Sequence, residues 1–136
     1  YFSSDEIVAE LEAALKRGVD VRIVVPADVD HQIMQANNAA DLKKLIDLGA
    51  RIYAYPGMTH LKATVCDDWA MFGSANYDTL SQRINVEMNL ASSDRSMVNA
   101  LVDRVFHPDF SRSRRMTAAM AQAEGSMAAE FVGDQL

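Results

Sequence analysis

The feature that most constrains the fold is a repeated pattern, in which an amphipathic helix is followed by a short β-branched strand. Residues 3–6 have the Ser-x-x-Glu spacing of a helix capping box, with Ser3 as the N-cap, and apolar residues then recur at helical spacing up to Gly18. The run over 21–25 is rich in valine and isoleucine and ends at Pro26. Such a run predicts a buried strand.

A second helix–strand unit follows the first. The polar segment over 28–38 predicts a short helix, and the pattern over 39–48 predicts a second amphipathic helix that ends at Gly49 and leads into a strand over 51–55. Farther along, we expect a strand over 60–66, a turn at 67–68, a return strand over 69–72, a helical turn over 77–82, a strand over 86–91 and a helix over 94–106. His107-Pro108 is expected to end that helix, and a short basic helix follows.

This order of elements predicts an α/β fold. The sheet is expected to be mixed, because the hairpin over 60–72 inserts antiparallel strands, and helices should flank both of its faces. We expect one catalytic domain over 1–116 that lacks its first strand. The Ala/Met-rich residues 117–136 are expected to form a helical or mobile tail.

Charge and composition exclude several classes of protein. The net charge is −6, so a bulk basic surface for nucleic acid or anionic lipid is absent. A single cysteine, Cys66, excludes an internal disulfide framework, and we expect its thiol to be buried. The apolar runs are far shorter than a membrane span, and no signal peptide is visible. Because the chain begins at Tyr1, we expect it to be a fragment of a longer protein.

The residues with the clearest chemistry lie in the predicted hairpin. On a strand, His60, Lys62 and Thr64 would share one face, while Leu61, Ala63 and Val65 would face the core. An imidazole beside an ammonium group suits an anionic substrate, because histidine titrates near neutral pH and lysine carries a fixed charge. The loop Gly73-Ser74-Ala75-Asn76 adds a hydroxyl, an amide and backbone N–H groups. Together these residues predict a site for a phosphate ester.

The combination His-x-Lys-x-x-x-x-Asp at 60–67, followed by Gly-Ser-x-Asn at 73–76, resembles the HKD signature of the phospholipase D superfamily. The resemblance extends over most of the chain, through 18–26, 49–53 and 87–90, to the C-terminal half of bacterial cardiolipin synthase-like members. One departure is visible, because five residues separate Asp67 from Gly73, one fewer than is common in the family. We interpret this as a shorter hairpin turn.

The resemblance implies a phospholipase D-like α/β sandwich that is one half of a pseudo-two-fold enzyme with two motifs. It implies cleavage or transfer of phosphodiesters through a phosphohistidine, with no metal and no cofactor. His60 would be a catalytic histidine, and Lys62 and Asn76 would be catalytic residues that bind the phosphate. Ser74 would support that phosphate pocket, and the catalytic Glu87 would orient the histidine ring.

Other residues receive structural or peripheral roles. Asp67 lies at the far end of the predicted strand from His60, so we interpret it as an acid that stabilises the turn, and Gly73 as a structural residue of the motif. His31 is a candidate for substrate contact from a loop, and a solvated loop histidine is the alternative reading.

Only one copy of the motif is present. The second half would lie upstream in the native chain, or a second copy would supply it in a homodimer. The first hypothesis is therefore a phosphatidyltransferase most like cardiolipin synthase, acting on a phospholipid at the cytoplasmic side of a bacterial membrane through peripheral contact. The alternatives are a metal-independent homodimeric phosphodiesterase or nuclease, which the acidic charge disfavours, and a non-catalytic phosphate-binding fragment.

Overall fold

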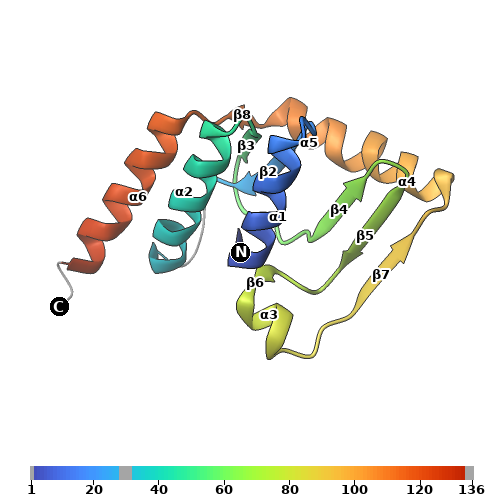
Figure 1. The fold of residues 1–136 in the computed structure, drawn as a ribbon, viewed down its shortest axis with the longest axis horizontal. Helices are drawn as coiled ribbons and strands as arrows, with labels where there is room; N and C mark the ends of the chain where they lie inside the picture. Colours follow the sequence, from blue (N-terminus) through green and yellow to red (C-terminus); the bar gives the residue numbers. More distant parts are fainter. Residues whose placement is uncertain (1, 28–31, 134–136) are drawn as a thin grey trace.

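The computed structural model describes residues 2–27 and 32–133. Short strands and six α-helices alternate along this part of the chain, in the order β1(Phe2–Ser3), α1(Asp5–Lys16), β2(Arg22–Pro26), α2(Gln32–Asp47), β3(Arg51–Tyr55), β4(Ala63–Cys66), β5(Trp69–Gly73), β6(Tyr77–Asp78), α3(Thr79–Arg83), β7(Asn89–Ser92), α4(Arg95–Leu101), η1(Val102–Phe106), α5(His107–Arg112), β8(Arg114–Arg115) and α6(Ala118–Gly133) (Figure 1). The α/β class expected from the sequence is confirmed.

The first helix begins one residue later than its sequence pattern predicts. Ser4, not Ser3, is the N-cap of α1, and its side-chain oxygen accepts the Ile7 N–H. Ser3 instead belongs to β1, which pairs in parallel with β6. The cap is therefore the next serine, which directly follows the two residues of β1. The predicted end is confirmed, because Gly18 has a φ of 84°.

The strands form three small sheets rather than one. β2 and β3 are parallel and β8 is antiparallel to β3, so the sheet β2-β3-β8 is mixed. The expectation that the hairpin makes this sheet mixed is wrong, because β8 occupies the edge of β3 and the hairpin β4–β5 pairs with β7 in a sheet of its own. β8 is too short for its sequence to have indicated it.

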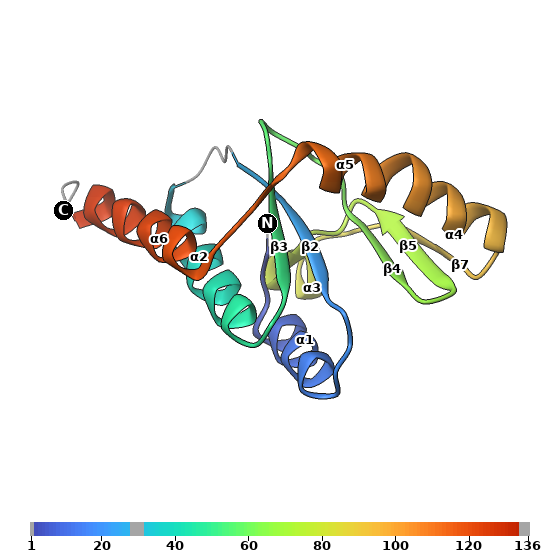
Figure 2. The ribbon, with the colours of Figure 1, turned by 90° about the horizontal axis from the view of Figure 1, so that it is seen from above.

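Helices cover both faces of β3, as the alternation of its side chains requires (Figure 2). Ile52 and Ala54 are buried in one core with Leu45 of α2 and Val8 of α1. On the other face, the rings of Tyr53 and Phe110 of α5 have centroids 4.7 Å apart. Because both faces of β3 are packed, the end of this strand at Tyr55, from which the chain continues to the hairpin, is held in place.

Residues 32–47 form one continuous helix, so the expected pair of helices over 28–38 and 39–48 is wrong. Residues 28–31 lie outside the described part of the chain. The stop at Gly49 is confirmed by its positive φ of 104°. Polar residues in the first half of α2 hide its continuity from a pattern based on apolar spacing alone.

The helix over 94–106 is present, but His107-Pro108 does not break it. Asp94 caps α4, and the chain runs through the π-helical turn η1 directly into α5, in which Pro108 occupies the first turn. A proline ring collides with the carbonyl four residues earlier in a regular α-helix. The wider π-turn before Pro108 is a local change of pitch at which such a conflict can be relieved.

The helix α6 packs along α2 (Figures 1 and 2). Ala121 of α6 and Met116 just before it belong to the same core as Leu45. A Cβ atom placed on Gly125 would lie 3.4 Å from the Cβ of Ala39, so small side chains line the contact between the two helices. The division of the chain at residue 116 stays a prediction, although its core extends to Ala121.

Candidate functional site

The predicted hairpin is present, with β4 and β5 joined by the two residues Asp67 and Asp68. Asp67 has a φ of 50°, a conformation that aspartate tolerates better than most residues. It lies at the opposite end of β4 from Lys62, as expected for a turn residue. Cys66 is exposed, and the expectation of a buried thiol is wrong because Cys66 lies next to the turn at the tip of the hairpin.

The strand that carries the motif is shorter than predicted. β4 begins at Ala63, so His60, Leu61 and Lys62 precede it, although the Gly73 N–H still donates to the Lys62 carbonyl at 3.1 Å. Leu61 is exposed rather than directed into the core. The two-residue alternation does not hold before Ala63, because pairing with β5 is what imposes it.

His60 and Lys62 are adjacent in space. The Lys62 ammonium donates to the His60 backbone carbonyl at 3.0 Å, and the His60 side chain is exposed. Partial burial lowers the pKa of Lys62, while the nearby Glu87 and Asp78 carboxylates act in the opposite direction. Lys62 is therefore a cation within electrostatic reach of the second part of the motif.

Gly73 lies where β5 and β7 approach each other closely. It pairs with Asn89, and a Cβ atom at Gly73 would lie 2.2 Å from both Asn89 Oδ1 and the Met88 carbonyl oxygen. Real Cβ atoms do not make such contacts. A glycine is therefore required here by space, and the close approach brings Ser74 to Glu87.

Glu87 is held by hydrogen bonds at both carboxylate oxygens. The Ser74 hydroxyl donates to Oε2 at 2.5 Å, and the Ser81 hydroxyl donates to Oε1 at 3.0 Å. The hydrogen bonds from Ser74 and Ser81 are the main causes that lower the pKa of Glu87. A weaker hydrogen bond from Asn85 and the positive charge of Lys62 lower it further. Glu87 is therefore a fixed, ionised carboxylate at neutral pH.

Ser81 is a site residue that the sequence analysis missed. It is only 6% exposed and lies in α3, where its N–H donates to the N-cap Asp78 at 2.7 Å. The predicted helical turn over 77–82 begins two residues too early, because Tyr77 and Asp78 form β6. The Asp-x-x-Ser spacing of a helix cap at 78–81 was the available signal.

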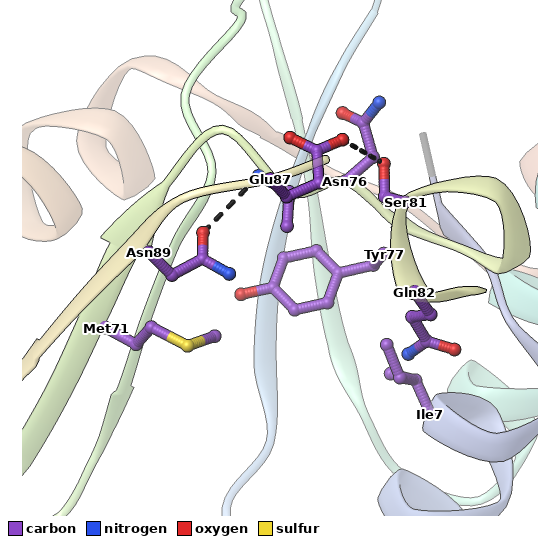
Figure 3. A pocket seen from close by; sticks show the side chains of 9 residues that line it. Ile7, Met71, Asn76, Tyr77, Ser81, Gln82, Glu87 and Asn89 are labelled. Carbon is purple, nitrogen blue, oxygen red and sulfur yellow. Dashed lines mark hydrogen bonds between the residues drawn. The ribbon is translucent and has the colours of Figure 1, made fainter. Parts of the chain in front are cut away.

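A cavity of about 260 Å³ lies beside the Glu87 carboxylate (Figure 3). Its polar lining comes from Asn76, Ser81, Gln82, Glu87 and Asn89, and its apolar lining from Ile7, Met71 and Ala75. The Tyr77 ring lies across it, and the Tyr77 hydroxyl contacts Thr64 of β4. Burial raises the pKa of Tyr77, so the phenol is neutral.

The structure thus gathers most, but not all, of the expected site. Asn76 and Glu87 line one cavity, Ser74 binds Glu87, and Lys62 is coupled to Glu87 by charge. Within the described residues, no hydrogen bond joins Glu87 to His60, so the orienting role of Glu87 stays a prediction. His31 lies outside the described residues.

Five exposed apolar side chains border the site. This apolar strip consists of Leu80, Ile84, Val86, Met88 and Leu90. Val86 is fully exposed at 103%, and Met88 is 82% exposed. The strand expected over 86–91 forms ladder pairs only as β7(Asn89–Ser92), which is an edge strand. Exposed apolar side chains gathered in one segment in this way are typical of an interaction site.

Two further properties hold for the residues that the structure describes. None of their helices is long and apolar enough to cross a membrane. Across residues 2–27 and 32–133, no three histidine, cysteine, aspartate or glutamate side chains lie close enough together to hold a metal ion.

Comparisons with known proteins agree with this geometry. The family described as "Cardiolipin synthase, PLD-like domain" matches residues 1–110. Cardiolipin synthase A of Pseudomonas putida strain F1 is 39% identical over 125 residues, which is 90% of this chain and 26% of that protein. Cardiolipin synthase A of Pseudomonas aeruginosa strain LESB58 is 35% identical over 120 residues, covering 86% of this chain and 24% of that protein. The chain therefore spans about a quarter of the length of these relatives.

A solved structure shares the fold. The phospholipase D family member Nuc from Salmonella typhimurium superposes with a TM-score of 0.72 at 20% sequence identity, over 85% of this chain and 76% of that one. This likeness confirms the expected α/β architecture.

Proposed function

Because this chain belongs to the phospholipase D superfamily of enzymes, within the family of cardiolipin synthase-like domains, we propose that it forms half of the active site of a phosphatidyltransferase. The substrate would be phosphatidylglycerol or a related phospholipid, and the acceptor an alcohol. The observation that carries this proposal is the convergence of Lys62, Asn76 and the clamped Glu87 at one end of the hairpin.

In the proposed mechanism, two imidazoles act on one phosphodiester. The first forms an N–P bond as the P–O bond to the leaving alcohol breaks, and the second, protonated, gives its proton to the leaving oxygen. The acceptor alcohol then loses its proton to the second imidazole, forms a new P–O bond and releases the first imidazole. His60 is one of this pair, and it would be the proton donor if both motifs lie in one chain.

The remaining residues would stabilise charge and orientation. Lys62 and Asn76 would bind the non-bridging phosphate oxygens, where negative charge develops. Glu87 would orient the His60 ring through its second nitrogen. Its fixed position and lowered pKa support this role, because the carboxylate stays ionised as the imidazole gains a proton.

We expect the complete protein that contains this chain to convert phosphatidylglycerol in vesicles and to leave single-stranded DNA intact. Activity should be unchanged, within about twofold, by EDTA, because the proposed phosphoryl transfer needs only imidazoles and fixed cations. Product analysis by thin-layer chromatography and gel electrophoresis measures both reactions. Cleavage of DNA without lipid turnover would favour the dimeric nuclease, and loss of activity in EDTA would contradict the mechanism.

The lipid substrate would require contact with a membrane surface. A second half of the site would cover the apolar strip. This half would come either from another part of the same native chain or from a second copy. The strip supports the proposal because it lies in the same segment as Ser81 and Glu87, so whatever covers it would lie next to the site.

On its own, the chain has only copies of itself to cover the strip, so we expect it to self-associate there. Val86→Asp should weaken that association by at least about tenfold, since a buried, unpaired carboxylate opposes it. Sedimentation velocity over a range of concentrations measures the effect. Val19→Asp is the matched control, because Val19 is also exposed but lies between α1 and β2. Equal association of both variants would contradict the proposal.

A further inference from the structure

Two amide side chains in the cavity have their oxygen atoms already engaged. The buried Ser4 hydroxyl, only 1% exposed, donates to Gln82 Oε1 at 2.7 Å, a shorter distance than the 3.1 Å to its other acceptor, Glu6. The Ala75 N–H donates to Asn89 Oδ1 at 3.4 Å. Each amide is thereby oriented, and its NH2 group is left for the cavity (Figure 3).

The two NH2 groups make no hydrogen bond to another residue in the part of the chain that the structure describes. Neither Gln82 Nε2 nor Asn89 Nδ2 donates a hydrogen bond there. Among the described residues of the lining, the one carboxylate is that of Glu87, and both of its oxygens already accept hydrogen bonds from Ser74 and Ser81. Gln82 and Asn89 are both exposed, so the cavity presents two oriented hydrogen-bond donors whose solvent partners a ligand oxygen could replace.

The charge of the lining restricts the acceptor further. Among the described residues that line the cavity, none is a lysine, arginine or histidine, and Glu87 is the one ionised group. A second phosphate or a carboxylate would meet the like charge of Glu87, and Lys62, the cation coupled to Glu87, is already assigned to the first phosphate. Hydroxyl oxygens are neutral acceptors, and Ile7 and Met71 supply an apolar wall for the carbon atoms between them.

Size and position complete the argument. At about 260 Å³ the cavity is smaller than the roughly 300–1,000 Å³ of sites for drug-sized ligands. It is also lined by Asn76, the expected phosphate ligand. A group in this cavity would therefore be small and attached to the phosphate.

We propose that Gln82 and Asn89 form a subsite for a small, uncharged, hydroxyl-bearing alcohol group of the phosphodiester, and that their NH2 groups select its hydroxyl oxygens. This inference rests on the proposed function, and it assigns the selection of the alcohol to two residues that no sequence motif indicated.

The first test compares two lipids in the complete protein. Phosphatidylglycerol and phosphatidyl-n-propanol differ in the two hydroxyls of the alcohol group. We expect the wild type to have a higher kcat/KM for phosphatidylglycerol than for phosphatidyl-n-propanol. In Gln82→Met the ratio of the two kcat/KM values should fall by about tenfold, the effect of one hydrogen bond. Gln122→Met, an exposed glutamine in α6, is the matched control and should keep the preference. An equal loss for both lipids in Gln82→Met would assign Gln82 a structural role and overturn the proposal.

A second test does not depend on turnover. The side-chain amide signals of Gln82 and Asn89 are followed by NMR during titration with glyceryl methyl phosphate or with n-propyl methyl phosphate, which lacks the two hydroxyls. We expect both signals to shift with the first probe at lower concentration than with the second. If the wild type turns over neither lipid, the proposed function fails but this titration still decides the subsite. Equal shifts with both probes, or none, would overturn it.

Discussion

Replacing His60 with alanine should lower phosphodiester turnover by the complete protein by more than about a thousandfold. The imidazole either forms the covalent bond to phosphorus or protonates the leaving oxygen, and loss of a group in either role has effects of that order. His60 is exposed and its side chain has no hydrogen bond in the described part of the chain, so stability should not change. Initial rates with a fluorescent phosphatidylglycerol would measure the loss.

His107→Ala is the matched control for this variant. His107 is an exposed histidine in α5, within ion-pair distance of Asp103 at 3.4 Å, and it lies outside the motif. It should keep full activity. Wild-type activity in His60→Ala would contradict the assignment of the motif, whereas equal losses in both variants would indicate a general effect on folding.

Gly73→Ala should have the second large effect, on stability as well as on activity. The new methyl group would collide with the Met88 carbonyl and with Asn89, and both contacts are close to the backbone of β7. Forcing the strands apart should cost about 1–3 kcal/mol, the usual range for overpacking. It would also move Ser74 away from Glu87, and a shift of about 1 Å in a positioned group can cost about a hundredfold in rate.

Urea unfolding and initial rates measure the two effects separately. Gly125→Ala is the control, because its Cβ would make an ordinary contact of 3.4 Å with Ala39, and alanine favours a helix interior by about 1 kcal/mol over glycine. It should be as stable as the wild type or more so. A stable, fully active Gly73→Ala would show that β7 can move away at no cost, contrary to the close approach described above.

The sequence predicts those parts of the fold that local periodicity determines. The helix over 5–16, the strand at 51–55 and the hairpin with its turn at Asp67 follow from spacing and from turn residues. The edge strand β8, the parallel pair β1–β6 and the contact between α6 and α2 do not, because each depends on residues far apart in the chain. Propensity alone carries no information about such pairing.

The same distinction holds within the site. His60, Lys62 and Asn76 could be named because they occur in a recognisable spacing. The Asp-x-x-Ser spacing could place Ser81 in a helix. It could not place Ser81 or Gln82 in the site, since their importance comes from Glu87 and Ser4, which approach them only in the folded chain. The expected position of His60 on a strand also failed for a tertiary reason, because the partner strand β5 ends opposite Lys62.

The pairing of β1 with β6 has a consequence for the construction of chimeric proteins. Residues 2–4 and 77–82 are remote in sequence, yet β1 pairs with β6, and the Ser4 hydroxyl donates a hydrogen bond to the Gln82 amide oxygen. A crossover between two homologous genes anywhere from residue 5 to residue 76 would separate these partners and combine a strand from one parent with a pocket from the other. Recombination libraries should therefore inherit residues 2–4 and 77–82 from a single parent, even though most of the domain lies between them.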